Sequence, residues 1–152
     1  MSTALRILVL NGPNLQLLGM REPGIYGTGT LAQLEEHCAR VARELGIEVE
    51  CRQSNHEGEL VDWIGNAPGH FQGIVLNAAA YTHTSVAILD ALKAVALPAV
   101  EVHLSDVSQR ESFRQISYAG MACIKTYMGL GFEGYRQAIL YLKDYLSKEA
   151  NV

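Results

Sequence analysis

The sequence predicts an α/β protein with a parallel sheet that is covered by helices on both faces. Short segments rich in Val, Ile and Leu, bounded by Gly, Pro or Asn, occur along the chain and are typical of buried strands. Segments whose apolar residues recur at helical spacing alternate with them. This regular alternation indicates a parallel sheet of five strands. We expect the strand order 2-1-3-4-5, in a single domain over residues 1–152.

The first strand is expected over Leu5–Leu10 and ends at the turn Asn11–Asn14. A long loop then runs to Tyr26, although strand-to-helix loops in such domains usually take about 2–6 residues. Longer loops often act as lids or binding loops, so we expect this one to serve the functional site. The first helix begins at Thr30–Gln33, which has the spacing of a capping box, and Gly46 ends it.

The rest of the chain continues the alternation of strand and helix. The second strand alternates polar and apolar residues, which suggests an edge position. The remaining elements are expected as a strand over 47–53, a short helix around 60–64, a strand over 73–77, a helix capped by Thr82 or Thr84 and closed by Pro98, a strand over 99–103, a short helix from Ser108 through Arg114 with a capping box at Ser108 and Glu111, a strand over 122–128 and a last helix through Leu146.

Composition narrows the class of protein. With 152 residues, 49% of them hydrophobic, the chain can bury the core of one domain. Its net charge of −4 argues against a nucleic-acid or acidic-membrane partner, and neither a signal peptide nor a membrane span is predicted. Cys38, Cys51 and Cys123 show no CxxC spacing, so we interpret them as reduced residues of a cytoplasmic protein. The partner is therefore expected to be a small molecule.

Glu101 and His103 form the first candidate functional pair. They stand two residues apart on the predicted fourth strand, so both side chains point to the same face. A carboxylate beside an imidazole orients the ring and favours its protonated form, which gives a proton donor near neutral pH. A purely structural ion pair is one alternative. A metal site that also uses His56, His83 and Asp90 is another, although the sequence has no HxH, HExxH or CxxC spacing.

Two asparagines and two arginines are expected near this pair. A sheet of this strand order has its ligand crevice beyond the carboxyl ends of the first and third strands. Asn14 and Asn77 follow or end those strands. Arg110 and Arg114 lie four apart on the predicted short helix and suit an anionic or polyhydroxylated ligand, unless they are solvated surface residues.

Two further positions carry polar groups to the same edge. Leu104 and Ser105 directly follow the fourth strand, where free backbone N–H groups can hold a carboxylate. His83 lies after the third strand, at a predicted helix start. It either binds a ligand hydroxyl or is a polar residue at a helix end.

Short polar and glycine-containing motifs are spread along nearly the whole chain. They occupy Asn11–Leu15, Arg21–Tyr26, Arg52–Ser54, Asn77, Tyr81–Ser85, Glu101–Ser105, Arg110, Arg114, Ser117–Tyr118, Gly129–Gly131 and Gly134–Tyr135. In this order the set closely resembles the type II 3-dehydroquinate dehydratases, also called type II dehydroquinases. The combination is highly specific, although no single motif would be.

The resemblance implies a flavodoxin-like fold and the cofactor-free, reversible anti-elimination of water from 3-dehydroquinate to give 3-dehydroshikimate. By the same resemblance, Tyr26 would abstract the proton beside the ketone, with Arg21 next to it. Asn14 would help to stabilise the resulting enolate through a water. His103, oriented by Glu101, would protonate the departing hydroxyl.

The resemblance also implies the substrate contacts and the assembly. The substrate-binding residues would be Asn77, His83, Asp90, Leu104, Ser105, Arg110 and Arg114. Asp90 would reach the site of a neighbouring subunit, because the family assembles as trimers packed into homododecamers. No metal or other cofactor is implied.

Three alternatives stay open at this point. The reaction could serve quinate catabolism instead of aromatic amino acid biosynthesis through the shikimate pathway. A non-catalytic flavodoxin-like module would carry an acidic cluster or a Ser/Thr-rich loop after the first strand, and Asn11–Asn14 offers neither. A Schiff-base dehydratase would use a lysine, for which Lys125 is the candidate.

Overall fold

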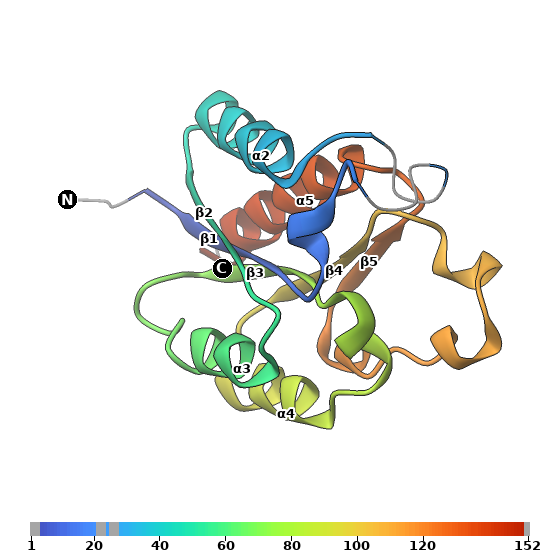
Figure 1. Cartoon of the computed structure of the whole chain (residues 1–152). Helices are drawn as coiled ribbons and strands as arrows, with labels where there is room; N and C mark the ends of the chain where they lie inside the picture. Colours follow the sequence, from blue (N-terminus) through green and yellow to red (C-terminus); the bar gives the residue numbers. More distant parts are fainter. Residues whose placement is uncertain (1–3, 21–23, 25–27, 151–152) are drawn as a thin grey trace.

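The computed structural model describes residues 4–20, 24 and 28–150 of the chain. A five-stranded parallel sheet forms its centre, in the order β2-β1-β3-β4-β5 (Figure 1). The strands are β1 (Arg6–Asn11), β2 (Glu48–Gln53), β3 (Gly73–Asn77), β4 (Ala99–His103) and β5 (Lys125–Met128). The predicted flavodoxin-like strand order is confirmed.

Four helices of the described residues cover the two faces of the sheet. Helices α2 (Leu31–Leu45) and α5 (Glu133–Ala150) lie on one face, and α3 (Glu57–Gly65) and α4 (Val86–Val95) lie on the other (Figure 1). The alternating side chains of each strand divide between two apolar cores. On β4, for example, Val100 and Val102 face α2 and α5, whereas Ala99 faces α3 and α4.

The first predicted helix has the expected ends. The Thr30 side chain accepts a hydrogen bond from the Gln33 backbone, and the Gln33 side chain accepts one from the Thr30 backbone. Gly46 closes the helix with φ of 70°, a left-handed conformation that glycine adopts without strain. The predicted cap of α4 is wrong, however. Ser85 accepts the Ile88 backbone N–H, since Thr82 is buried in a 3-10 turn over Ala79–His83.

The segment between β4 and β5 also differs from the prediction. Two 3-10 turns, Val107–Gln109 and Ser112–Arg114, replace the single helix expected over 108–114. The expected cap, Ser108, is itself engaged by Asp106, whose carboxylate accepts from its backbone N–H and its hydroxyl. Strand β5 starts three residues later than expected because Ala119–Ala122 forms another 3-10 turn.

The topology decides where side chains of different strands can meet. β2 and β3 pair with opposite sides of β1, so the chain changes its direction of growth across the sheet between them. Ligands of such sheets bind beyond the carboxyl ends of the strands at this change of direction. Among the helices of the described residues, none is long and apolar enough to cross a membrane.

Candidate active site

A pocket lies at the carboxyl ends of β1, β3 and β4. Its walls come from the turn after β1, the end of β3 with the following 3-10 turn, and the segment after β4. The residues that line it are Pro13, Asn14, Leu15, Asn77, Ala79, Ala80, His83, His103, Leu104, Ser105, Val107, Arg110 and Arg114. The pocket is therefore at the position that the strand order predicts.

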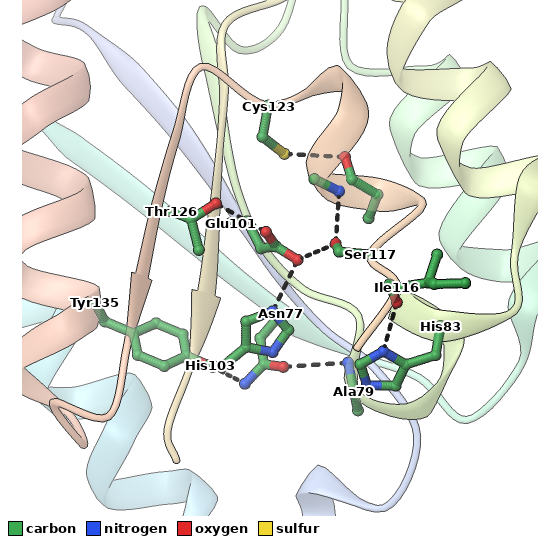
Figure 2. A network of polar contacts seen from close by, with 12 residues as sticks. Asn77, Ala79, His83, Glu101, His103, Ile116, Ser117, Cys123, Thr126 and Tyr135 are labelled. Atoms are coloured by element: carbon green, nitrogen blue, oxygen red, sulfur yellow. Dashed lines mark hydrogen bonds and ion pairs between the residues drawn. The ribbon is translucent and has the colours of Figure 1, made fainter. Parts of the chain in front are cut away.

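A buried ion pair stands at the wall of this pocket. His103 Nε2 lies 2.8 Å from Glu101 Oε2, and the side chains are only 8% and 5% exposed (Figure 2). The alternation of β4 directs both toward the same face, as expected from their spacing. Because Nε2 bonds the carboxylate, Nδ1 is the ring nitrogen that can act on a ligand in the pocket.

The Glu101 carboxylate has two further donors. The Ser117 hydroxyl donates to Oε2, and the Thr126 hydroxyl donates to Oε1 at 2.8 Å (Figure 2). Burial by itself raises the pKa of Glu101, but the hydrogen bonds from His103, Ser117 and Thr126 and the charge of His103 outweigh it, so the pKa is lowered. The carboxylate is thus held ionised beside the imidazole.

Gly120 completes the surroundings of this carboxylate. A Cβ at this position would lie 2.6 Å from Glu101 Oε1 and 2.7 Å from Ser117 Oγ, which is too close for any side chain. The Gly120 backbone N–H also donates to Ser117 Oγ at 2.9 Å. Only glycine allows the 3-10 turn over Ala119–Ala122 to pack this closely on Glu101.

His83 lies beside His103, and both residues line the pocket. The two rings are stacked, with centroids 6.5 Å apart and planes 16° from parallel. His83 Nδ1 donates to the Ile116 carbonyl at 2.8 Å, which leaves Nε2 as an acceptor (Figure 2). Burial, together with the charges of His103 and Arg114, lowers the pKa of His83 despite the Ile116 hydrogen bond, so this ring is neutral.

The two arginines come to the pocket from the segment after β4: Arg110 directly follows the 3-10 turn Val107–Gln109, and Arg114 ends the turn Ser112–Arg114. Arg110 and Arg114 are 14% and 22% exposed, and both line the pocket. Glu111 lies outside them, with its carboxylate 2.8 Å from Arg114 Nε and 3.7 Å from Arg110 Nε. Among the described residues, Glu111 is the carboxylate that contacts both guanidinium groups, and two guanidinium groups lining one pocket suit an anionic ligand.

The two asparagines come from the ends of β1 and β3. Asn14 is exposed and has φ of 69°, a left-handed conformation that asparagine tolerates better than most residues. Its backbone N–H donates to Asn55 Oδ1 at 3.0 Å. Asn77 is buried, and its Nδ2 donates to the Tyr135 hydroxyl at 2.9 Å.

The structure brings together most of the residues that the sequence singled out. Eight line the pocket and Glu101 contacts one of them. Asp90 is exposed on α4 and does not line the pocket, and Arg21 and Tyr26 lie outside the described residues. Within 4–20, 24 and 28–150, no three His, Cys, Asp or Glu side chains are grouped so that they could hold a metal ion.

Three functional contacts were missed by sequence reasoning. Ser117 and Thr126 hold Glu101 from 16 and 25 residues away, and Tyr135 contacts Asn77 from 58 residues away. All three are separate in sequence from the strands they support. Ser117 and Tyr135 belong to motifs of the family resemblance, which was the one signal that marked them.

Comparisons with known proteins agree with this geometry. The family model described as Dehydroquinase class II matches residues 5–143. The chain is 54% identical over 144 residues to 3-dehydroquinate dehydratase 2 of Pseudomonas putida, covering 95% of this chain and 97% of that one. It is 51% identical over 151 residues to 3-dehydroquinate dehydratase of Synechocystis sp., covering 99% of each.

Solved structures give the same assignment. The crystal structure of type II dehydroquinase from Butyrivibrio crossotus superposes with a TM-score of 0.91 at 44% identity, over 93% of this chain and 99% of that one. With a family model over most of the chain and relatives above 50% identity, the chain belongs to the class II dehydroquinase family.

Proposed function

We propose that this chain is a 3-dehydroquinate dehydratase that removes water from 3-dehydroquinate, by reversible anti-elimination, to give 3-dehydroshikimate. The observation that carries the proposal is the buried Glu101–His103 pair, which lies at a pocket that Arg110 and Arg114 also line. The reaction needs an acid for the leaving hydroxyl and a site for a carboxylated, polyhydroxylated ring. The Glu101–His103 pair would supply the acid and the pocket the site, and family membership supports the same reaction in the shikimate pathway.

His103 is the proposed acid. The ionised Glu101 accepts Nε2–H and leaves Nδ1 as the ring atom from which the departing hydroxyl would be protonated. Once Nδ1 has given up this proton, the neutral ring keeps the tautomer with hydrogen on Nε2, still bonded to Glu101. The carboxylate therefore orients the ring in both protonation states.

Tyr26 is the proposed base, and Arg21 and Asn14 assist it. Tyr26 and Arg21 enter the proposal from the sequence and the family alone. A free tyrosine has a pKa of about 10, so it acts as a base near neutral pH only if a nearby cation stabilises the phenolate. A unit charge at about 4 Å contributes roughly 4 kcal/mol at an effective dielectric of 20, which suffices. Asn14, at the pocket wall, would stabilise the enolate through a water.

The remaining pocket residues are proposed to bind the substrate. Neutral His83 offers Nε2 to a ring hydroxyl, and Asn77 and Arg114 line the same pocket. The backbone at Leu104 and Ser105, next to Arg110, would hold the carboxylate. The positive charge of the arginines suits this anionic end of the substrate.

We further propose a homo-oligomer in the cytoplasm, built from trimers into a dodecamer. Asp90 is exposed on α4 and does not line the pocket of its own chain. A role in substrate binding would therefore need a neighbouring subunit. Sedimentation analysis of the purified protein tests the assembly, and a stable monomer with full activity would contradict it.

The activity is tested by adding 3-dehydroquinate to the purified protein and following the ultraviolet absorbance of the conjugated product. We expect steady formation of 3-dehydroshikimate, and near-complete loss of turnover in Tyr26→Phe with ligand binding retained. Absence of product with folded protein would contradict the function, and substantial turnover in Tyr26→Phe would contradict the base. Borohydride added with substrate should leave no covalent adduct, since only a Schiff base on a lysine would be trapped.

A further inference from the structure

Asn77 is held on two sides by other groups of the protein. Its Oδ1 accepts the Ala79 backbone N–H at 3.1 Å, and its Nδ2 donates to the Tyr135 hydroxyl at 2.9 Å (Figure 2). The Tyr135 hydroxyl in turn donates to Asn11 Oδ1 at 2.6 Å. Asn11 and Asn77 are paired residues at the ends of β1 and β3, and Tyr135 reaches them from α5. Four residues thus form one chain of hydrogen bonds beside the pocket.

The backbone N–H of Ala79 fixes the direction of this chain. An N–H can only donate, so Asn77 must turn its oxygen to Ala79 and its NH₂ to Tyr135. The Tyr135 oxygen then accepts from Asn77, and its proton goes to Asn11. The opposite direction would give the Asn11 NH₂ a partner, which it lacks among the described residues. It would, however, set two donors, Asn77 NH₂ and Ala79 N–H, against each other.

Burial makes this direction matter. Tyr135 and Asn11 are fully buried, and Asn77 is 4% exposed. Loss of hydration raises the pKa of the Tyr135 phenol, so it stays protonated and can donate throughout the working pH range. In such surroundings an unmatched polar contact is costly, and the Asn77 amide has little freedom to rotate.

Among the described residues, these contacts leave one N–H of Asn77 without a partner. Oδ1 is taken by Ala79 and the first N–H by Tyr135, while the side chain lines the pocket. We propose that Tyr135 is a positioning residue, which holds Asn77 so that its second N–H is presented to the pocket as a donor. This wall of the pocket then selects a substrate oxygen that accepts a hydrogen bond, either a hydroxyl or a carboxylate.

The inference rests on the proposed function, in which Asn77 binds the substrate, and Tyr135→Phe tests it. This change removes one buried hydroxyl and frees Asn77 to rotate. We expect the KM for 3-dehydroquinate to rise about 5–10-fold with kcat within about twofold, the size of one lost hydrogen bond in ground-state binding. Tyr141→Phe is the matched control, because it makes the same chemical change on α5 at a ring that does not line the pocket. Its KM should be unchanged.

Two further variants separate the inference from the function on which it rests. If Asn77→Ala leaves KM unchanged, the assignment of Asn77 to substrate binding is wrong. If Asn77→Ala raises KM but Tyr135→Phe does not, the assignment stands and the inference on Tyr135 is overturned. The double variant should show the KM of Asn77→Ala alone, because Tyr135 acts through Asn77. If the fold-increases in KM of the two single variants multiply in the double variant, the inference is overturned.

If Tyr135→Phe does not fold, Asn11→Ala tests the same inference, because Asn11 is at the other end of the chain of hydrogen bonds. Without Asn11 Oδ1 the Tyr135 proton can turn toward Asn77, which weakens the fixed direction of the chain. We expect a rise in KM of similar size with the circular dichroism spectrum retained. A folded Asn11→Ala variant with the original KM would overturn the inference.

Discussion

Replacing Gly120 by alanine tests whether the Glu101 carboxylate is held as tightly as the structure indicates. The new Cβ would lie 2.6 Å from Glu101 Oε1 and 2.7 Å from Ser117 Oγ, whereas ordinary contacts begin at 3.4 Å. Gly120 does not have a positive φ, so alanine brings no backbone strain of that kind and the effect is a steric one. Either the carboxylate or the 3-10 turn that carries Gly120 must move.

The size of the effect follows from the contacts of that carboxylate. Moving Oε1 by roughly 1 Å breaks its 2.8 Å hydrogen bond from Thr126, and a bond to a charged group contributes about 1.5–3 kcal/mol. For a chain of this length we expect the melting temperature to fall by about 3–12 °C. Displacing Glu101 also turns His103, and a misplacement of about 1 Å can lower kcat by up to 100-fold.

Thermal unfolding and steady-state turnover of 3-dehydroquinate measure the two effects. Gly58→Ala is the control, since Gly58 lies in α3 and a Cβ there has nothing within 4 Å. Alanine should stabilise that helix by about 0.5–1 kcal/mol and leave kcat unchanged. If Gly120→Ala retains both the original melting temperature and kcat, the tight packing on Glu101 is refuted.

Three other predictions concern the same group of side chains. Thr126→Val removes a donor that holds the pKa of Glu101 below its ordinary value. The stability that this ionised carboxylate contributes is lost as the pH falls through its pKa. Because the variant has a higher Glu101 pKa, its melting temperature should begin to fall at a higher pH when the protein is acidified. The pKa of His83 is lower in the folded protein than in the unfolded chain. As the pH falls below about 6.5, His83 is therefore protonated more readily in the unfolded chain, and the stability of the folded protein decreases. His83→Asn should therefore show a flatter dependence of melting temperature on pH between 7 and 5, and equal slopes would speak against a neutral His83. His103→Ala should abolish loss of water but retain some exchange of the substrate proton beside the ketone, which NMR in deuterated water can follow. If both processes disappear, the role of His103 is not limited to the leaving group.

The sheet and the Glu101–His103 pair could be predicted because local patterns determine them. Buried strands are short apolar runs with clear boundaries, and the capping box at Thr30–Gln33 specifies a helix start within four residues. The two-residue period of a strand likewise places Glu101 and His103 on one face without any knowledge of the fold. Each of these inferences needs only neighbouring residues.

The rest of the site depends on contacts that no local pattern records. The prediction of a helix beginning at Ser108 was wrong, because Asp106 binds Ser108 and short 3-10 turns form over the same residues instead. Ser117 and Thr126 reach Glu101 only once β5 is paired with β4. Tyr135 lies on a helix far along the chain, where an aromatic residue looks like any other member of the core.

The pocket combines side chains from both faces of one sheet, which explains its place in the fold. Asn11 and Asn77 point toward α5, where Tyr135 meets them, whereas Glu101 points the other way, toward the 3-10 turn over Ala119–Ala122. Polar groups on opposite faces can act on one ligand only beyond the end of the sheet, because the strands separate them elsewhere. Each half is therefore supported by its own layer: a substitution behind Asn77 should change substrate affinity, and one behind Glu101 should change turnover.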